Sequence, residues 1–474
     1  MLIGLFIYSI LTFSLSLLII FLERKNPEKI SSWLLYLAIN PLLGLIIYLL
    51  FGCTYLKESL FRSRNLPEEF LEKEVLMQKE VIAEKKIYLQ KSFKNRQLAK
   101  LLLRSSDAIL TRSTRIKILN NGDEKFKYLL EDLNKAQKSI HLEYYIFRSD
   151  RIGNKIQEVL VRKSKEGVKV RIIFDGLGSR KLSPSFLEEL KEAGVEIEWF
   201  FPLRFPQVLR TLNYRNHRKL IIIDGVIGYC GGINVGNEYC SLDPKYGFWR
   251  DIHLRIEGPS VGSLQTVFLK DWYYLTHQNL FSEEYLPSPS EKGEILTQII
   301  AGGPDSPQEP IKENIFSLIV TAEKEIFLTT PYFIPDESMV WALRSAALRG
   351  VKVTLVLQGR PDHKITYYAS STYLPELVRA GVGVYRYQKG ILHSKVITID
   401  GEIGVIGSTN LDIRSFQIDF ECSVVIYNSE VVREIIKSQE DDLKYSHFLT
   451  EEAVEDWFTY TCKGTLARLL SPLL

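Results

Sequence analysis

The chain has 474 residues, of which 46% are hydrophobic, and its 60 Lys and Arg nearly balance 57 Asp and Glu to give a formal net charge of +3. This length exceeds one ordinary domain, and so mild a charge gives no reason to expect a nucleic-acid partner. The five cysteines form no CxxC pair and no cysteine–histidine cluster at metal-ligand spacing, so we expect a reducing compartment and no metal site.

The N-terminal region is the least globular part of the sequence. Residues 1–22 form an almost unbroken apolar run and residues 33–51 form a second one, each long enough to span a bilayer as a helix. A cleaved signal peptide fits less well, because charged residues 23–25 follow the first run and no Lys or Arg precedes it. We therefore predict two transmembrane segments within residues 1–55. Pro41 leaves open a bent or re-entrant second segment.

The following segment, residues 56–115, is predicted to be a basic helical linker. Between residues 85 and 104 it carries seven Lys or Arg and no acidic residue, interleaved with apolar residues at helical spacing. Such a face suits the surface of an anionic membrane. An equally good interpretation is the solvated basic face of a helix that packs on the catalytic body.

From residue 116 onward the sequence repeats itself. Short β-branched runs alternate with amphipathic helical stretches, in the same order twice, which is typical of α/β units. The matching segments are 138–147 with 324–333, 167–174 with 350–357, and 193–197 with 380–384. The sequence therefore predicts two tandem mixed-sheet α/β halves with pseudo-twofold symmetry, at residues 116–300 and 301–474.

One pattern, His-x-Lys-x-x-x-x-Asp, occurs once in each copy. All three positions are offset by 176 residues, and an Asn follows each Asp ten residues later. Two copies in register inside a larger repeat are very unlike a chance surface pattern. The candidate catalytic residues are His217, Lys219, Asp224, His393, Lys395 and Asp400, with Asn234 and Asn410 after them.

The spacing of this motif suits phosphate chemistry. Residues two apart on a strand point to the same face, so a His and a Lys can converge on one phosphate. Phosphoryl transfer needs a nucleophile, an acid for the leaving oxygen and donors around the developing charge. One histidine can attack phosphorus while the other moves the proton. The expected donors to the nonbridging oxygens are Lys219, Lys395, Asn234, Asn410 and Ser408.

At these residues the sequence resembles the phospholipase D superfamily, and more narrowly the bacterial cardiolipin synthases. The similarity extends over nearly the whole chain, through segments 24–27, 48–52, 141–147, 174–179, 214–217, 249–251, 257–259, 330–333, 361–363 and 470–474. It implies two halves around one site without metal or cofactor, and it favours His217 as the nucleophile.

The same resemblance implies the substrate and the location. It implies that one phosphatidylglycerol gives its phosphatidyl group to another, forming cardiolipin and glycerol, with anionic membrane lipid as the partner. It also implies a multi-pass protein of the bacterial inner membrane with cytoplasmic catalytic halves, which the balanced charges beside the apolar runs do not decide by themselves.

The motif aspartates have two possible roles. In superfamily relatives a carboxylate on the following strand often backs the histidine, and Asp251 and Glu421 fit that position. Asp224 and Asp400 would then brace the fold, so a catalytic and a bracing role both stay open.

One position departs from a simple duplication, and two further histidines are candidate site residues. The first copy has Gly232 where the second has Ser408, so the first half lacks that hydroxyl. His141 and His363 lie in segments that resemble site-lining loops, which makes them candidate substrate contacts or plain loop histidines.

Two rival functions stay open. A membrane-tethered phosphodiesterase would cleave phospholipid or nucleic acid with the same histidines and with water as the acceptor. A catalytically silent scaffold fits less well, because both motif copies are intact. A transferase with a different alcohol or phospholipid as acceptor is also consistent with the sequence, which does not indicate the oligomeric state.

Overall fold

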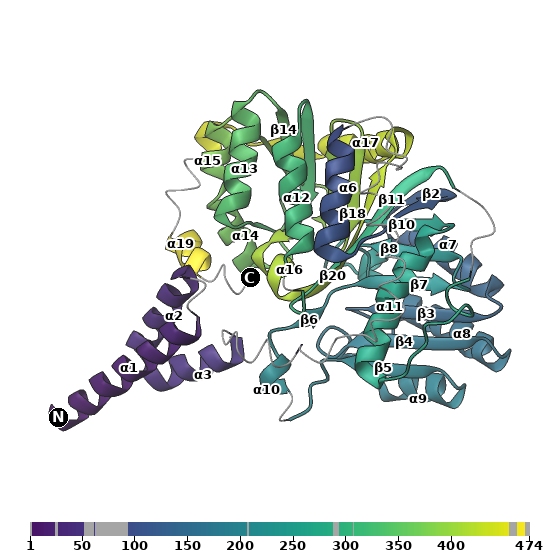
Figure 1. Ribbon diagram of the computed structural model, residues 1–474, viewed down its shortest axis with the longest axis horizontal. Coiled ribbons are helices and arrows are strands. Elements are labelled where there is room, and N and C mark those ends of the chain that lie inside the picture. The colour runs from purple at the N-terminus through teal and green to yellow at the C-terminus, as the bar shows by residue number, and fades with distance from the viewer. Residues whose placement is uncertain are drawn as a thin grey trace.

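The computed structural model describes residues 2–23, 27–51, 61, 93–205, 208–287, 293–306, 308–454 and 462–469. Figure 1 shows two α/β bodies side by side and a group of helices that projects from them at the N-terminal end.

The first body is built on a seven-stranded mixed sheet. Its strands follow the order β2 (Arg115–Asn120), β10 (Ile252–Glu257), β8 (Ile227–Gly231), β7 (Lys219–Ile223), β3 (Ser139–Tyr144), β4 (Lys169–Asp175) and β5 (Glu196–Phe200). The strands β3, β4 and β5 pair in parallel and the others antiparallel. Parallel neighbours need crossover helices, here α8 (Arg151–Lys165) and α9 (Pro184–Glu192).

The second body repeats this order. Its strands are β11 (Ile295–Gly302), β20 (Asp419–Tyr427), β18 (Ile403–Gly407), β17 (Val396–Ile399), β12 (Glu325–Thr330), β14 (Lys352–Gln358) and β15 (Gly383–Tyr387). Two short strands extend its edges, β1 (Leu110–Ser113) beside β11 and β21 (Ser446–Phe448) beside β15. Strand by strand the two sheets correspond, so the predicted pair of mixed-sheet halves with pseudo-twofold symmetry agrees with the structure.

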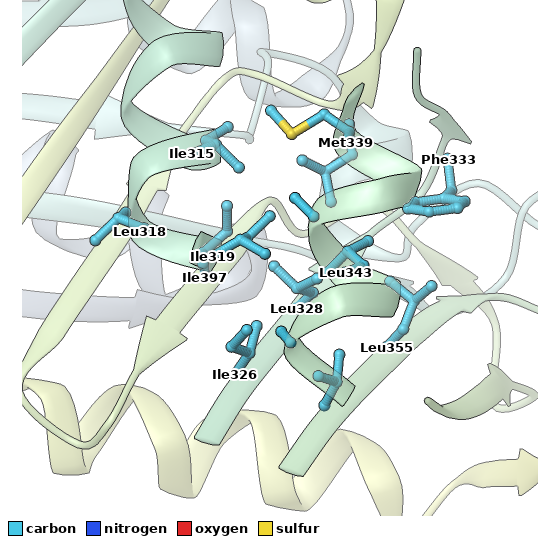
Figure 2. Close-up of a cluster of buried hydrophobic side chains, with 14 of the residues drawn as sticks. Ile315, Leu318, Ile319, Ile326, Leu328, Phe333, Met339, Leu343, Leu355 and Ile397 are labelled. Atoms are coloured by element: carbon cyan, nitrogen blue, oxygen red, sulfur yellow. The ribbon is translucent and has the colours of Figure 1, made fainter. Parts of the chain in front are cut away.

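Each half has its own core between sheet and helices. In the first half α7 (Asn121–Lys135), α8 and α9 cover the sheet. In the second half α12 (Pro310–Thr321) and α13 (Glu337–Leu348) pack on β12 and β14, and Figure 2 shows the hydrophobic side chains that fill this layer. The strands are Val- and Ile-rich and almost continuously buried, as expected for sheets covered on both faces.

A third core joins the two sheets to each other. It combines side chains of β7, β8 and β10 with those of β17, β18 and β20 and with α11 (Ser260–Thr276). Cys230 and Cys422 lie in it, with the Cys230 sulfur 3.9 Å from the Cys422 carbonyl oxygen. Two short parallel strand pairs also cross between the halves: β6 (Arg215–Asn216) with β20, and β16 (Ile391–Leu392) with β9 (Trp249–Arg250).

The second predicted membrane segment is divided in the structure. The chain forms α1 (Leu2–Leu22), α2 (Pro27–Ile39) and α3 (Pro41–Phe51), with 21, 13 and 11 residues (Figure 1). Proline cannot continue α2, and the Asn40 side chain accepts a hydrogen bond from the Leu43 N–H, so a new helix starts at this point. Among the residues that the structure describes, no helix is both long enough and apolar enough to cross a membrane. The predicted transmembrane hairpin is therefore not confirmed.

The predicted linker ends in elements that belong to the second half. Residues 52–60 and 62–92, which include the start of the basic stretch, lie outside the described residues. From there α6 (Phe93–Ser106) packs through Leu98 and Leu102 into the core of the second half. The strand β1 then joins the edge of the second sheet. The boundary predicted at residue 300 falls inside β11, because that strand opens the second sheet rather than closing the first.

Candidate active site

Both motif histidines lie where the two halves meet. His217 directly follows β6 and His393 directly follows β16. The His217 N–H donates to the Phe420 carbonyl at 2.9 Å, and the His393 N–H donates to the Arg250 carbonyl at 2.7 Å. Each histidine is therefore fixed by a main-chain bond to the opposite half.

A buried carboxylate holds each imidazole ring. His217 Nδ1 lies 2.8 Å from Glu421 Oε1, and His393 Nδ1 lies 2.7 Å from Asp251 Oδ2. Both carboxylates are fully buried. These two acids are the predicted backing residues, and the structure brings both to the histidines. It also shows that they are exchanged, because each acid backs the histidine of the other half.

The Glu421 carboxylate is supported by the second half and fixed by the first. The Ser408 hydroxyl donates to Glu421 Oε2 and accepts the Cys422 N–H at 3.0 Å. The buried Arg218, between His217 and Lys219 in the chain, pairs with Asp271 and donates to the Glu421 carbonyl at 3.2 Å. Arg218 was not among the predicted site residues, although a charged residue inside a motif that leads into a buried strand is a usable signal.

The Asp251 carboxylate has no serine hydroxyl beside it, because Gly232 occupies the position that matches Ser408. One of its own oxygens bonds to the main chain instead. The Ile252 N–H donates to Asp251 Oδ1 at 2.7 Å. A Cβ on Gly232 would lie 2.2 Å from that same oxygen, closer than any real contact. Glycine at this position is therefore what makes room for the shorter acid, and it explains the departure between the two motif copies.

The two motif lysines lie in one electrostatic environment. Lys219 Nζ donates to the His217 carbonyl, and Lys395 Nζ donates to the His393 carbonyl at 2.6 Å. Burial lowers the pKa of Lys219 to about 7, against the attraction of Glu421, and the charge of Lys395 lowers it further. Burial also lowers the pKa of Lys395 to about 8. The amines of both halves thus converge on one region.

The histidines are neutral in this environment. Burial lowers the pKa of His217 well below its ordinary value, and Lys219, Lys395 and His393 lower it further. Burial and Lys395 lower the pKa of His393 as well. When Nδ1–H is donated to the carboxylate, Nε2 carries the free lone pair. Each half therefore offers one nitrogen that can attack or accept a proton.

The structure does not bring the motif aspartates to the histidines. Asp224 and Asp400 stand in turns with φ of 53° each, at the far ends of β7 and β17. Their carboxylates accept backbone N–H groups of the loops that lead into β3 and β12, namely those of Gln137, Lys138, Ser139, Glu323, Lys324 and Glu325. Of the two roles that the sequence left open for these aspartates, the bracing role fits this geometry.

Two of the three predicted phosphate donors beyond the lysines, Asn234 and Ser408, bond to the protein itself. Asn234 accepts the Ile146 N–H at 3.1 Å and donates to the Tyr239 hydroxyl at 3.2 Å. Ser408 is bound to Glu421 and to the main chain at Cys422. Asn410 is buried, and its side-chain oxygen has no hydrogen-bond partner among the described residues. Of these three only Asn410 keeps an open polar atom.

The two loop histidines differ. His141 is buried and stacks on Phe268 with ring centroids 4.6 Å apart, and burial lowers its pKa to about 3. It is a core residue of the first half. His363 is exposed and lies near Tyr332, whose ring contacts His393.

Two buried histidine–carboxylate pairs with adjacent amines can carry out phosphoryl transfer by a covalent route. One Nε2 can attack phosphorus while the other protonates the leaving oxygen, and the amines neutralise charge on the nonbridging oxygens. Together, two repeated mixed sheets and one histidine–lysine pair from each define an enzyme of the phospholipase D type.

Comparison with known proteins agrees with this class. The family model described as the phospholipase D-like domain of cardiolipin synthase matches residues 129–272 and 315–443. Cardiolipin synthase 2 of Bacillus anthracis is 42% identical over 468 residues, covering 96% of this chain and 89% of the relative. The major cardiolipin synthase of Bacillus subtilis (strain 168) is 39% identical over 475 residues, covering 99% of this chain and 98% of the relative.

A solved structure supports the fold. The crystal structure of phosphatidylserine synthase from Haemophilus influenzae matches with a TM-score of 0.63 at 14% identity, covering 80% of this chain and 100% of that chain. The chain belongs to the bacterial cardiolipin synthase family and is a phosphatidyltransferase of the phospholipase D type.

Proposed function

We propose that this enzyme transfers a phosphatidyl group from one phosphatidylglycerol to a second, releasing glycerol and forming cardiolipin, through a phosphohistidine on His217. The pair of histidine–carboxylate contacts between the halves, 2.8 Å and 2.7 Å long, carries this proposal. The near full-length similarity to cardiolipin synthases supports the choice of substrate.

In the first step, His217 Nε2 attacks the phosphorus of the donor lipid. A bond forms between nitrogen and phosphorus, and the bond from phosphorus to the oxygen of the headgroup glycerol breaks, so that the phosphatidyl group stays on the histidine. His393 gives a proton to that oxygen from its imidazolium form, which is the minor form because its pKa is lowered, and which Asp251 favours by opposing that lowering. Lys219 and Lys395 bind the nonbridging oxygens of the pentacoordinate phosphorus.

In the second step, a hydroxyl of another phosphatidylglycerol replaces His217. His393, now neutral, takes the hydroxyl proton as the new phosphorus–oxygen bond forms and the phosphorus–nitrogen bond breaks. Glu421 returns the departing imidazole to its original tautomer through the Nδ1 contact. Asp224 and Asp400 take no part, and they hold the loops at the opposite strand ends.

The substrate places the enzyme at a lipid surface. Along α1 to α3 many large apolar side chains are exposed, among them Phe6, Phe13, Phe21, Ile39 and Leu42. Contiguous exposed apolar surface of this kind suits contact with lipid. We place the catalytic halves on the cytoplasmic side of the bacterial cell membrane, attached through these helices.

Product analysis tests this function. Purified protein is incubated with radiolabelled phosphatidylglycerol as the only lipid, and cardiolipin plus glycerol is scored against phosphatidic acid plus glycerol. Cardiolipin that disappears in both His217→Ala and His393→Ala is the expected result. Phosphatidic acid alone would make the enzyme a hydrolase, because water would then be the acceptor.

A further inference from the structure

A second carboxylate lies beside His393, and the steps above do not use it. Asp362 follows β14, and its Oδ2 accepts a hydrogen bond from the Tyr332 hydroxyl. The Tyr332 ring meets the His393 ring edge-on, with centroids 6.5 Å apart. Burial lowers the pKa of both His393 and Lys395, and Asp362 is among the charges that oppose this lowering. The hydroxyl, the carboxylate and the imidazole therefore form one cluster.

This carboxylate keeps room for a ligand. The Asp362 side chain is 10% exposed and that of its neighbour His363 is 71% exposed, so the cluster opens to the surface. Besides the Tyr332 hydroxyl, the carboxylate accepts the His363 N–H at 2.8 Å. A carboxylate can accept about four hydrogen bonds, so acceptor capacity remains for a hydroxyl group of a substrate.

The corresponding loop of the first half offers no such group, because its polar side chain is buried and bonded to the main chain. After β4, the Ser179 hydroxyl donates to the Tyr145 carbonyl at 2.9 Å and accepts the Phe147 N–H at 3.0 Å. Ser179 is fully buried, and a Cβ on Gly178 would lie 2.1 Å from the Tyr145 carbonyl oxygen. Tyr145 packs on His217 at 4.9 Å, as Tyr332 packs near His393. Between these two loops, only the second offers the aromatic ring a partly exposed carboxylate.

We propose that Asp362, oriented by Tyr332, binds the nonreacting hydroxyl of the acceptor's glycerol headgroup while His393 Nε2 takes the proton from the hydroxyl on the neighbouring carbon. The inference rests on the proposed function and adds the means by which a diol is preferred to water and to simple alcohols. It assigns acceptor recognition to the second half, on the side of the proton-transferring histidine.

A competition between acceptors tests this subsite. Full-length enzyme is incubated with labelled phosphatidylglycerol in detergent micelles that also contain ethanol, and cardiolipin, phosphatidylethanol and phosphatidic acid are measured in one reaction. All three products arise from the same covalent intermediate, so their ratios report acceptor choice independently of how fast the intermediate forms. Ethanol is an acceptor with a single hydroxyl, which needs no second contact.

The variants are Asp362→Asn, Tyr332→Phe and, as a matched carboxylate-to-amide control, Glu166→Gln at the exposed position that follows the last residue of α8. Loss of a hydrogen bond to a charged group should lower the ratio of cardiolipin to phosphatidylethanol about tenfold in Asp362→Asn. The decrease in Tyr332→Phe should be about fivefold, because that variant leaves the carboxylate in place but unoriented. Glu166→Gln should keep the wild-type ratio.

The possible failures can be told apart. A wild-type enzyme that forms no cardiolipin would overturn the proposed function, and the subsite with it. Cardiolipin from the wild type, with an unchanged ratio in Asp362→Asn, would overturn the subsite alone. An equal decrease of cardiolipin and phosphatidylethanol would show that Asp362 acts only through His393, which also contradicts the proposal. Unfolding midpoints of all variants show whether a change reflects damaged folding.

Discussion

The two halves share a strand order but solve the same local problem differently. Both must hold a histidine through Nδ1 with a buried carboxylate. In one site the longer Glu421 is joined by the Ser408 hydroxyl, and in the other the shorter Asp251 reaches the main chain directly over Gly232. The acid and the residue beside it therefore differ together between the halves. Glu421 goes with Ser408 and Asp251 goes with Gly232, because a serine at position 232 would collide with Asp251.

The largest expected effect comes from the two histidines. His217→Ala and His393→Ala should each lower turnover by on the order of 10⁴-fold or more, because each removes a group that bonds to the reacting atoms. A donor with a nitrophenol headgroup separates their roles, since this leaving group needs no proton. With a labelled phosphatidyl group, His393→Ala should then still form the covalent phosphatidyl-enzyme, and His217→Ala should not. The opposite result would reverse the roles of the two halves.

The exchanged carboxylates come next. Glu421→Gln and Asp251→Asn should each lower kcat on the order of 10³-fold, because an amide no longer fixes the tautomer or stabilises the charged ring. Glu257→Gln, a partly exposed carboxylate at the far end of β10, is the matched control and should be neutral. Steady-state assays suffice, and more than a tenth of wild-type kcat in Glu421→Gln would mean that the contact with His217 has no catalytic role.

The difference at Gly232 can be tested by an exchange. Gly232→Ser should lower kcat/KM by about 10- to 100-fold, because the new side chain collides with Asp251 in a fully packed interior. Adding Asp251→Glu should recover part of the loss by recreating the Ser408–Glu421 arrangement. A double-mutant cycle measures the coupling. Purely additive losses would contradict the view that the two positions form a unit.

The lowered pKa values of the two motif lysines, one in each half, predict that kcat/KM depends on pH. Their lowered pKa values, about 7 for Lys219 and about 8 for Lys395, mean that positive charge is lost as pH rises through this range. We expect kcat/KM, which reports the free enzyme, to fall by up to about tenfold per pH unit above that range. In kcat the fall should lie at higher pH, because bound phosphate favours the charged amines. Equal profiles for the two constants would exclude the lysines as the titrating groups.

The smallest effect on activity is expected at the motif aspartates. Asp224→Ala and Asp400→Ala should each lower the free energy of unfolding by about 2 kcal/mol, because backbone N–H groups lose a charged partner. At a temperature where both variants are folded, kcat should stay within about twofold of the wild type. Denaturant titration and activity measured in parallel check this. A large loss of kcat in folded Asp224→Ala would return this residue to the catalytic set.

Much of the fold was predictable because the same pattern of strands, helices and motif residues occurs twice in the sequence. The motif offset of 176 residues fixed which strands correspond, and period-two spacing placed His217 beside Lys219 and His393 beside Lys395. The acids Asp251 and Glu421 could be selected through the resemblance to superfamily relatives, in which a carboxylate on the following strand often backs the histidine. Their exchange between the halves could not, because it depends on how the sheets pack, and no local pattern encodes that packing.

Other parts of the site needed coordinates for similar reasons. Sequence cannot tell a hydroxyl that faces substrate from one that faces a carboxylate, so Ser408 was expected on phosphate and is found on Glu421. His141 looked like a loop residue, yet it stacks under α11, since that contact joins residues far apart in the chain. The division of the second apolar run at Asn40 was foreshadowed by Pro41, but the sequence left its form open.

The crossed histidine–carboxylate pairs also bear on how such a molecule can arise. A single half contains a histidine and an acid that do not meet, so it holds no complete pair by itself. Two identical copies related by a twofold axis would complete each other, each giving its acid to the other's histidine across an isologous interface. The present chain holds such a crossed arrangement inside one polypeptide, where the two positions need not carry the same residues.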